Sequence, residues 1–253
     1  MSWFCVLIRT AAIVLILFSQ SGVVFAAEGK TVLITGGNRG IGLALAERFN
    51  EAGYKVIATA RSPEKASDLK ALEVRVEQLD VTDPASVDAL ASRLDGLSID
   101  FLVNNAGIKG HETKELSDLE IDRLELTFDV NTLGPLRVTQ ALFDNVQKSD
   151  HKVVANISST MGSIELNTWG CCLGYRASKT ALNSLTKTLS VNYAETGMIF
   201  VTLHPGYVQT DMNDGQGNIT PSQSADGLFQ VISQLKTSDN GHYYDFSGKE
   251  LPW

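Results

Sequence analysis

Apolar residues along this chain gather in short continuous runs, and between the runs they recur with the period of a helix. Continuous runs rich in Val and Ile, without alternation, are typical of strands that are covered on both faces of a sheet. The pattern therefore predicts buried strands, with candidates at residues 30–35, 55–60, 74–79, 99–103, 152–157 and 198–204 and a short last one near 242–246.

Helical stretches lie between these runs. Asp83-Pro84 and Thr220-Pro221 each place a capping side chain before a proline, which favours a helix start. Alternating strands and helices predict an α/β fold, a doubly wound parallel sheet (Rossmann fold) of about seven strands with helices on both faces, and ligands bind beyond the carboxyl ends of such strands. The expected helices span about residues 40–52, 84–95, 117–147, 174–196 and 221–236.

A glycine-rich turn, Gly36-Gly37-Asn38-Arg39-Gly40-Ile41-Gly42, follows the first strand candidate and precedes a helical stretch. Glycines permit positive φ and let the backbone approach a pyrophosphate, while the helix N-terminus offers free N–H groups to the phosphates. The spacing Gly-x-x-x-Gly-x-Gly differs from the common Gly-x-Gly-x-x-Gly, so the turn is judged by its context. Strand, turn and helix in that order predict a dinucleotide-binding turn.

Tyr175 and Lys179 lie four residues apart at the front of a helical stretch. A phenol titrates near 10 in water, so a tyrosine acts as an acid or base near neutral pH only if its anion is stabilised. Residues four apart project from one face of a helix, so the Lys179 ammonium can approach the phenolate and lower its pKa. A solvated surface Tyr and Lys would have the same spacing, and the other motifs decide between the two.

Several motifs occur together in one order, and with them the chain resembles the short-chain dehydrogenase/reductase family over about residues 30–253. Within the family it is most similar to the carbonyl-reductase and C-signal-like branch, on Thr35–Gly42, Asn156–Ser159 and the closing Gly248–Trp253. The motifs that carry the resemblance are Gly36, Gly40 and Gly42, Asn104-Asn105-Ala106-Gly107, Asn131, Ser158-Ser159, Tyr175 and Lys179, and Pro205-Gly206.

The resemblance implies four catalytic residues. Tyr175 would supply a proton, and Lys179 would assist it and bind ribose hydroxyls. Ser159 would donate a hydrogen bond to the substrate carbonyl, and Asn131 would hold a water that links Lys179 to solvent. Sixteen residues separate Ser159 from Tyr175, a longer gap than usual, so Ser158 is the alternative serine. Asn131 could also be a helix-kink residue without a chemical role.

The expected cofactor is NADP, favoured over NAD. After the second strand candidate, Thr59-Ala60-Arg61 offers no acid for a ribose 2′-hydroxyl, whereas Arg61 and Arg39 could hold a 2′-phosphate. The resemblance further implies that Asp80 contacts the adenine and Thr210 the carboxamide. The expected cofactor-binding residues are Gly36, Asn38, Arg39, Gly40, Ile41, Gly42, Arg61, Asp80, Val81, Asn104, Ala106, Gly107, Tyr175, Lys179, Pro205, Gly206, Val208 and Thr210.

These residues predict an NADP(H)-dependent oxidoreductase that reduces a ketone or aldehyde to an alcohol. The substrate is expected to be a small or medium carbonyl compound with an apolar part, because Trp169, Tyr207 and Met212 could form an apolar wall and no clear carboxylate or phosphate site is evident. The alternatives are a nucleotide-binding sensor of the C-signal type and an epimerase or dehydratase acting on nucleotide sugars. The last generally needs a larger C-terminal region.

Composition limits the partners. The 253 residues, 43% of them hydrophobic, suffice for one core, so residues 27–253 are expected to form one domain. The net charge is −8 without a dense basic cluster, so no nucleic-acid partner is expected. His111 and His204 fit no ligand cluster, so no metal is assigned. The resemblance implies a homodimer or homotetramer, although carbonyl-reductase-like members can be monomers.

Residues 1–26 have the pattern of an export signal, with Arg9 before an apolar run and small residues that suit cleavage after Ala26. The mature protein is then expected in a periplasmic, secreted or ER-lumenal location. An uncleaved membrane anchor is the alternative. Cys171 and Cys172 are too few for a disulfide scaffold and could be buried apolar residues, a vicinal disulfide or substrate-pocket thiols. The first of these is the default expectation.

Overall fold

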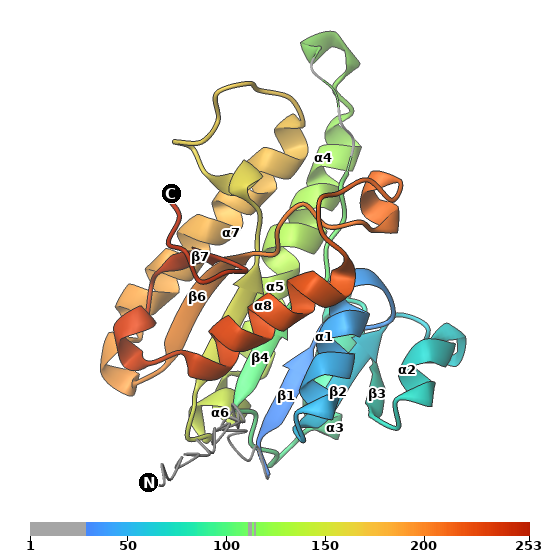
Figure 1. Cartoon of the computed structure of the whole chain (residues 1–253), viewed down its shortest axis with the longest axis vertical. Helices are drawn as coiled ribbons and strands as arrows, with labels where there is room; N and C mark the ends of the chain where they lie inside the picture. Colours follow the sequence, from blue (N-terminus) through green and yellow to red (C-terminus); the bar gives the residue numbers. More distant parts are fainter. Residues whose placement is uncertain (1–28, 111–112, 114) are drawn as a thin grey trace, which may run out of the picture.

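Among the residues that the computed structural model describes, 29–110, 113 and 115–253, the strands form one sheet in the order β3-β2-β1-β4-β5-β6-β7 (Figure 1). Every neighbouring pair in this sheet is parallel. The order reverses between β1 and β4, so a crevice opens beyond their carboxyl ends. The strands are β1 (Thr31–Ile34), β2 (Lys55–Ala60), β3 (Arg75–Gln78), β4 (Phe101–Asn104), β5 (Val153–Ile157), β6 (Ile199–His204) and β7 (Tyr243–Asp245).

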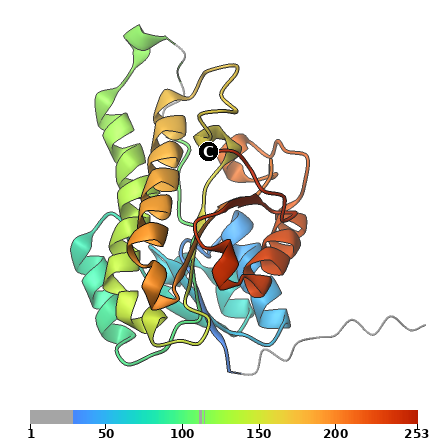
Figure 2. The same ribbon diagram turned by 90° about the vertical axis from the view of Figure 1, so that its left-hand side faces the viewer.

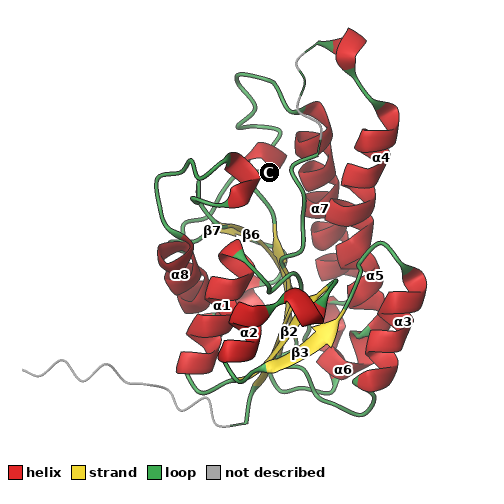
Figure 3. Ribbon diagram, turned by 90° about the vertical axis from the view of Figure 1, so that its right-hand side faces the viewer, coloured by secondary structure: helices red, strands yellow, loops and turns green. Residues whose placement is uncertain are grey.

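Helices cover both faces of the sheet, as Figures 2 and 3 show. On one face Phe49 and Leu228 pack in the core, and on the other Leu90 and Val138 do the same. Helices α1, α2 and α8 belong to the first face. The helices are α1 (Gly40–Glu51), α2 (Ser67–Ala71), α3 (Pro84–Arg93), α4 (Ile121–Phe128), α5 (Gly134–Ala141), α6 (Phe143–Gln147), α7 (Leu173–Asn192) and α8 (Pro221–Gln234).

The predicted doubly wound sheet is confirmed, and each strand candidate matches an observed strand to within two residues. Both predicted proline starts are also confirmed. The Asp83 side chain accepts a hydrogen bond from the Ala85 N–H, and Thr220 forms a capping box with Gln223.

The single helix expected over residues 117–147 is wrong. A π-helical turn at Asp129–Leu133 separates α4 from α5, and a further break precedes α6. Pro135 has no N–H to donate to a carbonyl one turn earlier, so the chain cannot keep the regular α-helical register there. The short helix α2 was not predicted, because only Leu69 of its five residues is buried and the apolar period is too short to detect.

The expected export signal or anchor, residues 1–26, lies outside the described residues. None of the helices in the described part of the chain is both long and apolar enough to cross a bilayer.

Candidate active site

A cleft of about 740 Å³ lies at the carboxyl ends of the central strands. The loops after β1, β2, β3, β4, β5 and β6 and the front of α7 line it. Most of the predicted site residues line this cleft: Gly36, Asn38, Arg39, Gly40, Ile41, Gly42, Arg61, Asp80, Val81, Ala106, Gly107, Tyr175, Lys179, Pro205 and Thr210.

The other predicted residues, Asn104, Asn131, Ser159, Gly206 and Val208, each lie next in the chain to a lining residue rather than in the wall itself.

The glycine turn is pinned to the loop after β4. Gly36 has φ +66, and a Cβ on it would lie 3.0 Å from the Ala106 Cα atom. A Cβ on Gly42 would collide with the Gly36 carbonyl oxygen. The Asn105 side chain donates hydrogen bonds to the carbonyls of Thr35 at 3.0 Å and Gly36 at 3.1 Å. Asn105 therefore holds the turn in place, and the turn leaves the N-terminus of α1 facing the cleft.

Positive charge gathers at one end of the cleft, where Arg39, Arg61 and Lys65 all line the wall. The exposed Arg39 guanidinium donates to the Asp211 carboxylate at 3.0 Å across the cleft mouth. Burial would raise the pKa of the nearby Asp80 carboxyl, but hydrogen bonds from Thr82 and the charge of Arg61 outweigh burial and lower it. This end of the cleft is therefore suited to a phosphate-bearing ligand.

Tyr175 and Lys179 lie at the other end, on the first turns of α7. The Lys179 side chain is only 4% exposed, and its Nζ atom lies 5.9 Å from the centre of the Tyr175 ring. Nζ donates a hydrogen bond to the Ile157 carbonyl at 2.8 Å, at the end of β5. Burial in the protein interior lowers the pKa of Lys179 to about 8. The amine is therefore cationic at neutral pH and close enough to stabilise a phenolate.

Asn131 lies in the π-helical turn and is fully buried. Its amide nitrogen donates to the Ile108 carbonyl and the Ser178 hydroxyl, and its Oδ1 accepts from the Ile108 N–H. A Cβ on Gly107 would lie 3.3 Å from Asn131 Oδ1 and 3.7 Å from Lys179 Nζ, so both groups flank Gly107. The structure therefore shows the helix irregularity at Asn131 and places this residue near Lys179.

The serine pair after β5 has two different environments. The buried Ser158 hydroxyl donates to Asn183 Oδ1 at 2.6 Å and ties the strand to α7. The Ser159 hydroxyl accepts a hydrogen bond from the Met161 N–H at 3.2 Å, an interaction that does not use its own proton. His204 accepts from the Thr160 N–H, and burial lowers the His204 pKa to about 4, which keeps the ring neutral. Ser158 lines the cleft and Ser159 lies next to it, but the Ser158 proton is already donated to Asn183, so the hydrogen bonds favour Ser159 as a donor to a ligand.

Asn104 belongs to a polar row that crosses the sheet below the cleft. Asn104, Asn156, Thr202 and Tyr243 are paired on the consecutive strands β4, β5, β6 and β7. The Asn104 amide donates to Asn156 Oδ1 and to the Thr139 hydroxyl. Within the described chain, Asn104 Oδ1, Thr202 Oγ1 and the Tyr243 hydroxyl are buried without a hydrogen-bond partner. Asn104 therefore supports the sheet. It does not line the cleft, so other residues lie between it and the place where the expected cofactor would bind.

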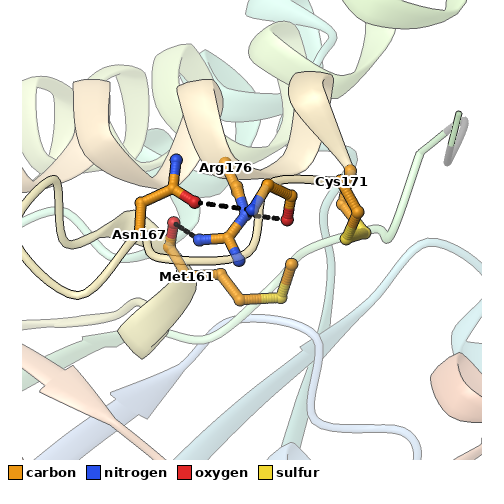
Figure 4. The surroundings of a disulfide bond; sticks show 6 residues. Met161, Asn167, Cys171 and Arg176 are labelled. Atoms are coloured by element: carbon orange, nitrogen blue, oxygen red, sulfur yellow. Dashed lines mark hydrogen bonds between the residues drawn. A yellow bond between two sulfur atoms is a disulfide. The ribbon is translucent and has the colours of Figure 1, made fainter. Parts of the chain in front are cut away.

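Cys171 and Cys172 form a vicinal disulfide between the loop after β5 and α7 (Figure 4). The default expectation of two buried apolar residues is therefore wrong, because the sulfurs are bonded and Cys171 is half-buried. Trp169 does not line the cleft. It is 61% exposed, and the Arg176 guanidinium carbon lies 4.5 Å from its ring centre. Met212 does line the cleft, whereas Tyr207 is half exposed and donates to Gln216.

Three of the contributions to this region that were not predicted concern charge or packing. Lys65 adds a cation to the phosphate-suited end, and Leu126 of α4 adds an apolar side chain to the wall. Arg176 is buried beneath the loop after β5. Lys65 could have been expected, since it follows Arg61 by one short turn, but no pattern indicates Leu126 or Arg176. Among the described residues no group of three or more His, Cys, Asp or Glu side chains could hold a metal ion.

Comparison with known proteins shows a similarity that covers most of the chain and not single motifs alone. A family model for short chain dehydrogenases matches residues 30–218. C-signal of Myxococcus xanthus is 38% identical over 155 residues, which cover 61% of this chain and 93% of C-signal.

Two solved structures share the fold, and in each case the aligned part covers 88% of this chain and 99% of the other. The NADPH-bound carbonyl reductase from chicken fatty liver is 34% identical, with a TM-score of 0.81. The carbonyl reductase Sniffer of D. melanogaster is 30% identical, with a TM-score of 0.85.

Proposed function

Because this chain belongs to the short-chain dehydrogenase family, we propose that it is an NADP(H)-dependent oxidoreductase that reduces a ketone or aldehyde to an alcohol. The observation that carries the proposal is the position of Tyr175 and the buried cationic Lys179 on the wall of the cleft that begins at the glycine turn. If Tyr175 and Lys179 had only structural roles, there would be no reason to bury a charged amine beside the phenol, because burying a charge costs free energy.

The cleft fits a nicotinamide dinucleotide. Its volume lies in the range of cofactor sites, about 300–1,000 Å³. The residues of the glycine turn line the cleft, so a ligand can approach their backbone. At Gly40 the nearest atom to a Cβ would belong to the Thr210 side chain, at 3.4 Å. Arg61, Arg39 and Lys65 would hold a 2′-phosphate at the basic end. Similarity to an NADPH-bound carbonyl reductase supports the choice of NADP over NAD.

The residues at the other end would carry out the proton chemistry. A bound NADPH would supply the hydride that reduces the carbonyl carbon. Tyr175 would give its hydroxyl proton to the carbonyl oxygen, and the Lys179 ammonium would stabilise the resulting phenolate. Ser159 would donate a hydrogen bond to the same oxygen as negative charge develops on it. Asn131 would help to hold a water near Lys179, from which the proton is replaced.

The proposed substrate class follows from the apolar part of the cleft wall. Leu126 and Met212 line the cleft, so a carbonyl compound with an apolar part is the proposed substrate. The carbonyl reductases similar to this chain support the same class.

The test is NADPH oxidation by the purified protein with a panel of aldehydes and ketones, run in parallel with NADH. Tyr175→Phe should retain NADPH binding, measured by fluorescence titration, while turnover falls about 10²- to 10⁴-fold. Thr180→Val on the same helix is the control, since its hydroxyl bonds only to backbone carbonyls among the described contacts. Turnover that survives in Tyr175→Phe would contradict the proposed proton donor.

The similarity to C-signal supports a second candidate, a nucleotide-binding signalling protein with little catalytic role. The same variant separates the two functions. A sensor would keep its cellular effect in Tyr175→Phe, whereas an enzyme would lose it together with turnover.

A further inference from the structure

Two adjacent cysteines lie where the loop of residues 161–172 joins the helix that carries Tyr175 (Figure 4). We infer that Cys171 and Cys172 are a reversible thiol–disulfide site that sets the shape of this loop and, through it, which carbonyl substrates the cleft accepts. The part of this inference that concerns substrates rests on the proposed reductase function. The redox chemistry of the two cysteines is independent of that function.

The disulfide lies at the start of the helix that carries Tyr175. Cys172 caps the N-terminus of α7, three residues before Tyr175, and its carbonyl accepts a hydrogen bond from the Arg176 N–H at 2.9 Å. Any change in the backbone at Cys172 therefore acts on the first turn of the helix that holds Tyr175. Residues 164–170 of the loop are exposed, and besides this junction they are held by the hydrogen bond from the Glu165 N–H to the Trp253 carbonyl and by the contact of Trp169 with Arg176.

Arg176, on α7, forms hydrogen bonds near both ends of the loop. Its Nε donates to the Gly170 carbonyl at 3.0 Å, and one Nη donates to the Met161 carbonyl at 3.4 Å (Figure 4). The side chain is only 7% exposed, and its other Nη has no hydrogen-bond partner among the described residues. A buried guanidinium without an acid partner is stable only while these carbonyls stay in place. The burial of Arg176 thus depends on the position of Gly170, the residue that precedes the disulfide.

The backbone at this position depends on the bond between the sulfurs. Gly170, Cys171 and Cys172 all have positive φ, at 68°, 69° and 55°. Such values suit glycine but are uncommon for other residues. A bond between neighbouring side chains closes a small ring and limits the backbone to few conformations, so its reduction lets Cys171 and Cys172 return to negative φ. That return would move the Gly170 carbonyl away from Arg176 and release Trp169.

The chemistry requires a dithiol as reductant. A thiolate of the dithiol attacks the half-buried Cys171 sulfur, forming a mixed disulfide, and the electrons of the broken bond leave on the Cys172 sulfur. Cys172 suits the leaving role because a thiolate at a helix N-terminus is stabilised by the free N–H groups. The second thiol of the reagent then displaces Cys171, so that two protein thiols and one oxidised dithiol result.

The first test uses the full chain, purified without reductant and then divided into untreated and dithiothreitol-treated portions. Each portion is alkylated, denatured and digested with trypsin, and the peptide of residues 153–176 is weighed. Untreated protein should give this peptide unlabelled and two hydrogens lighter than the dithiol form, and treated protein should give it doubly labelled. Because the assay reads one peptide, Cys5 does not interfere. A doubly labelled peptide from untreated protein would overturn the inference.

The second test measures the consequence. Hydrogen exchange of residues 161–176 should be faster in the treated protein and in Cys171→Ser/Cys172→Ser than in the untreated protein. KM for a bulky aryl ketone should change on the order of tenfold between the oxidised and reduced forms, while KM for a short aldehyde and Kd for NADPH should not. Cys5→Ser is the control and should behave as the parent.

The two proposals fail in different ways. Equal exchange and equal KM values in the two redox forms would overturn the role of the disulfide. Absence of turnover in both forms with every carbonyl tested would contradict the reductase function, while the peptide mass and the exchange rates would still report on the redox site.

Discussion

Replacing Lys179 with methionine should make the protein more stable at neutral pH while it removes activity. The amine is 4% exposed, and burial lowers its pKa from 10.5 to about 8. Since a tenfold change in proton affinity corresponds to about 1.36 kcal/mol, this lowered pKa means that the charged amine costs about 3 kcal/mol of folding free energy below pH 8. Methionine removes this cost but also the charged hydrogen bond to the Ile157 carbonyl, worth about 1.5–3 kcal/mol. The net expectation at neutral pH is a gain of up to about 1.5 kcal/mol.

The pH dependence provides the sharper measurement. Because the folded-state pKa lies below the unfolded one, the unfolded chain binds more protons between pH 8 and 10.5, and the wild type gains stability as pH rises through this window. Urea unfolding at pH 7 and at pH 10 should therefore show Lys179→Met more stable at pH 7 and the difference shrinking or reversing at pH 10. The control is Lys187→Met, which removes an exposed amine bonded to the Gly241 carbonyl on the same helix. A difference between Lys179→Met and wild type that is the same at both pH values would refute the reasoning.

Three further predictions concern the cleft and the sheet below it. Ser159→Ala should lower kcat about 10²- to 10³-fold and cost only about 1 kcal/mol of stability, because it removes the acceptor of the Met161 N–H. Ser158→Ala should lower the free energy of unfolding by about 1–3 kcal/mol, because Asn183 Oδ1 loses its donor, and should leave kcat nearly unchanged; a large loss of kcat in Ser158→Ala alone would exchange the roles of the serines. Arg61→Ala should raise KM for NADPH on the order of tenfold and leave KM for NADH unchanged, and an equal effect on both would remove Arg61 from the 2′-phosphate site. Thr202→Val should raise the free energy of unfolding by about 1–2 kcal/mol in urea titrations, since its buried hydroxyl lacks a partner, and a loss of stability would point to a bound water there.

Much of the fold could be predicted because its signals are local. A strand buried on both faces is a continuous apolar run, and the caps at Asp83 and Thr220 are visible in two residues each. The glycine turn and the Tyr175–Lys179 spacing are equally short patterns. The break at Asp129–Leu133 could not be predicted, because the same apolar period continues through a π-helical turn.

The rest of the site depends on contacts between distant residues. Ser158 and Ser159 are neighbours in the sequence, and only the partner Asn183, 25 residues away, distinguishes them. The disulfide was one of three alternatives for Cys171 and Cys172, and the positive φ that both residues adopt beside it is not visible in the sequence. In the sequence Arg176 cannot be told from an exposed helical arginine, because its burial depends on how the loop after β5 folds over it.

The two buried cations of α7 share a feature that relates to the chemistry. Lys179 and Arg176 are held by backbone carbonyls, those of Ile157, Gly170 and Met161, and neither forms an ion pair with an acid among the described residues. A carboxylate beside Lys179 would raise the pKa of the amine and offset its positive potential at the Tyr175 hydroxyl, so the phenolate would be stabilised less. Carbonyl oxygens fix the position of the amine through dipoles that leave its net charge in place. In the proposed mechanism, the uncompensated positive charge of Lys179 would therefore stabilise the Tyr175 phenolate and help Tyr175 give up its proton near neutral pH.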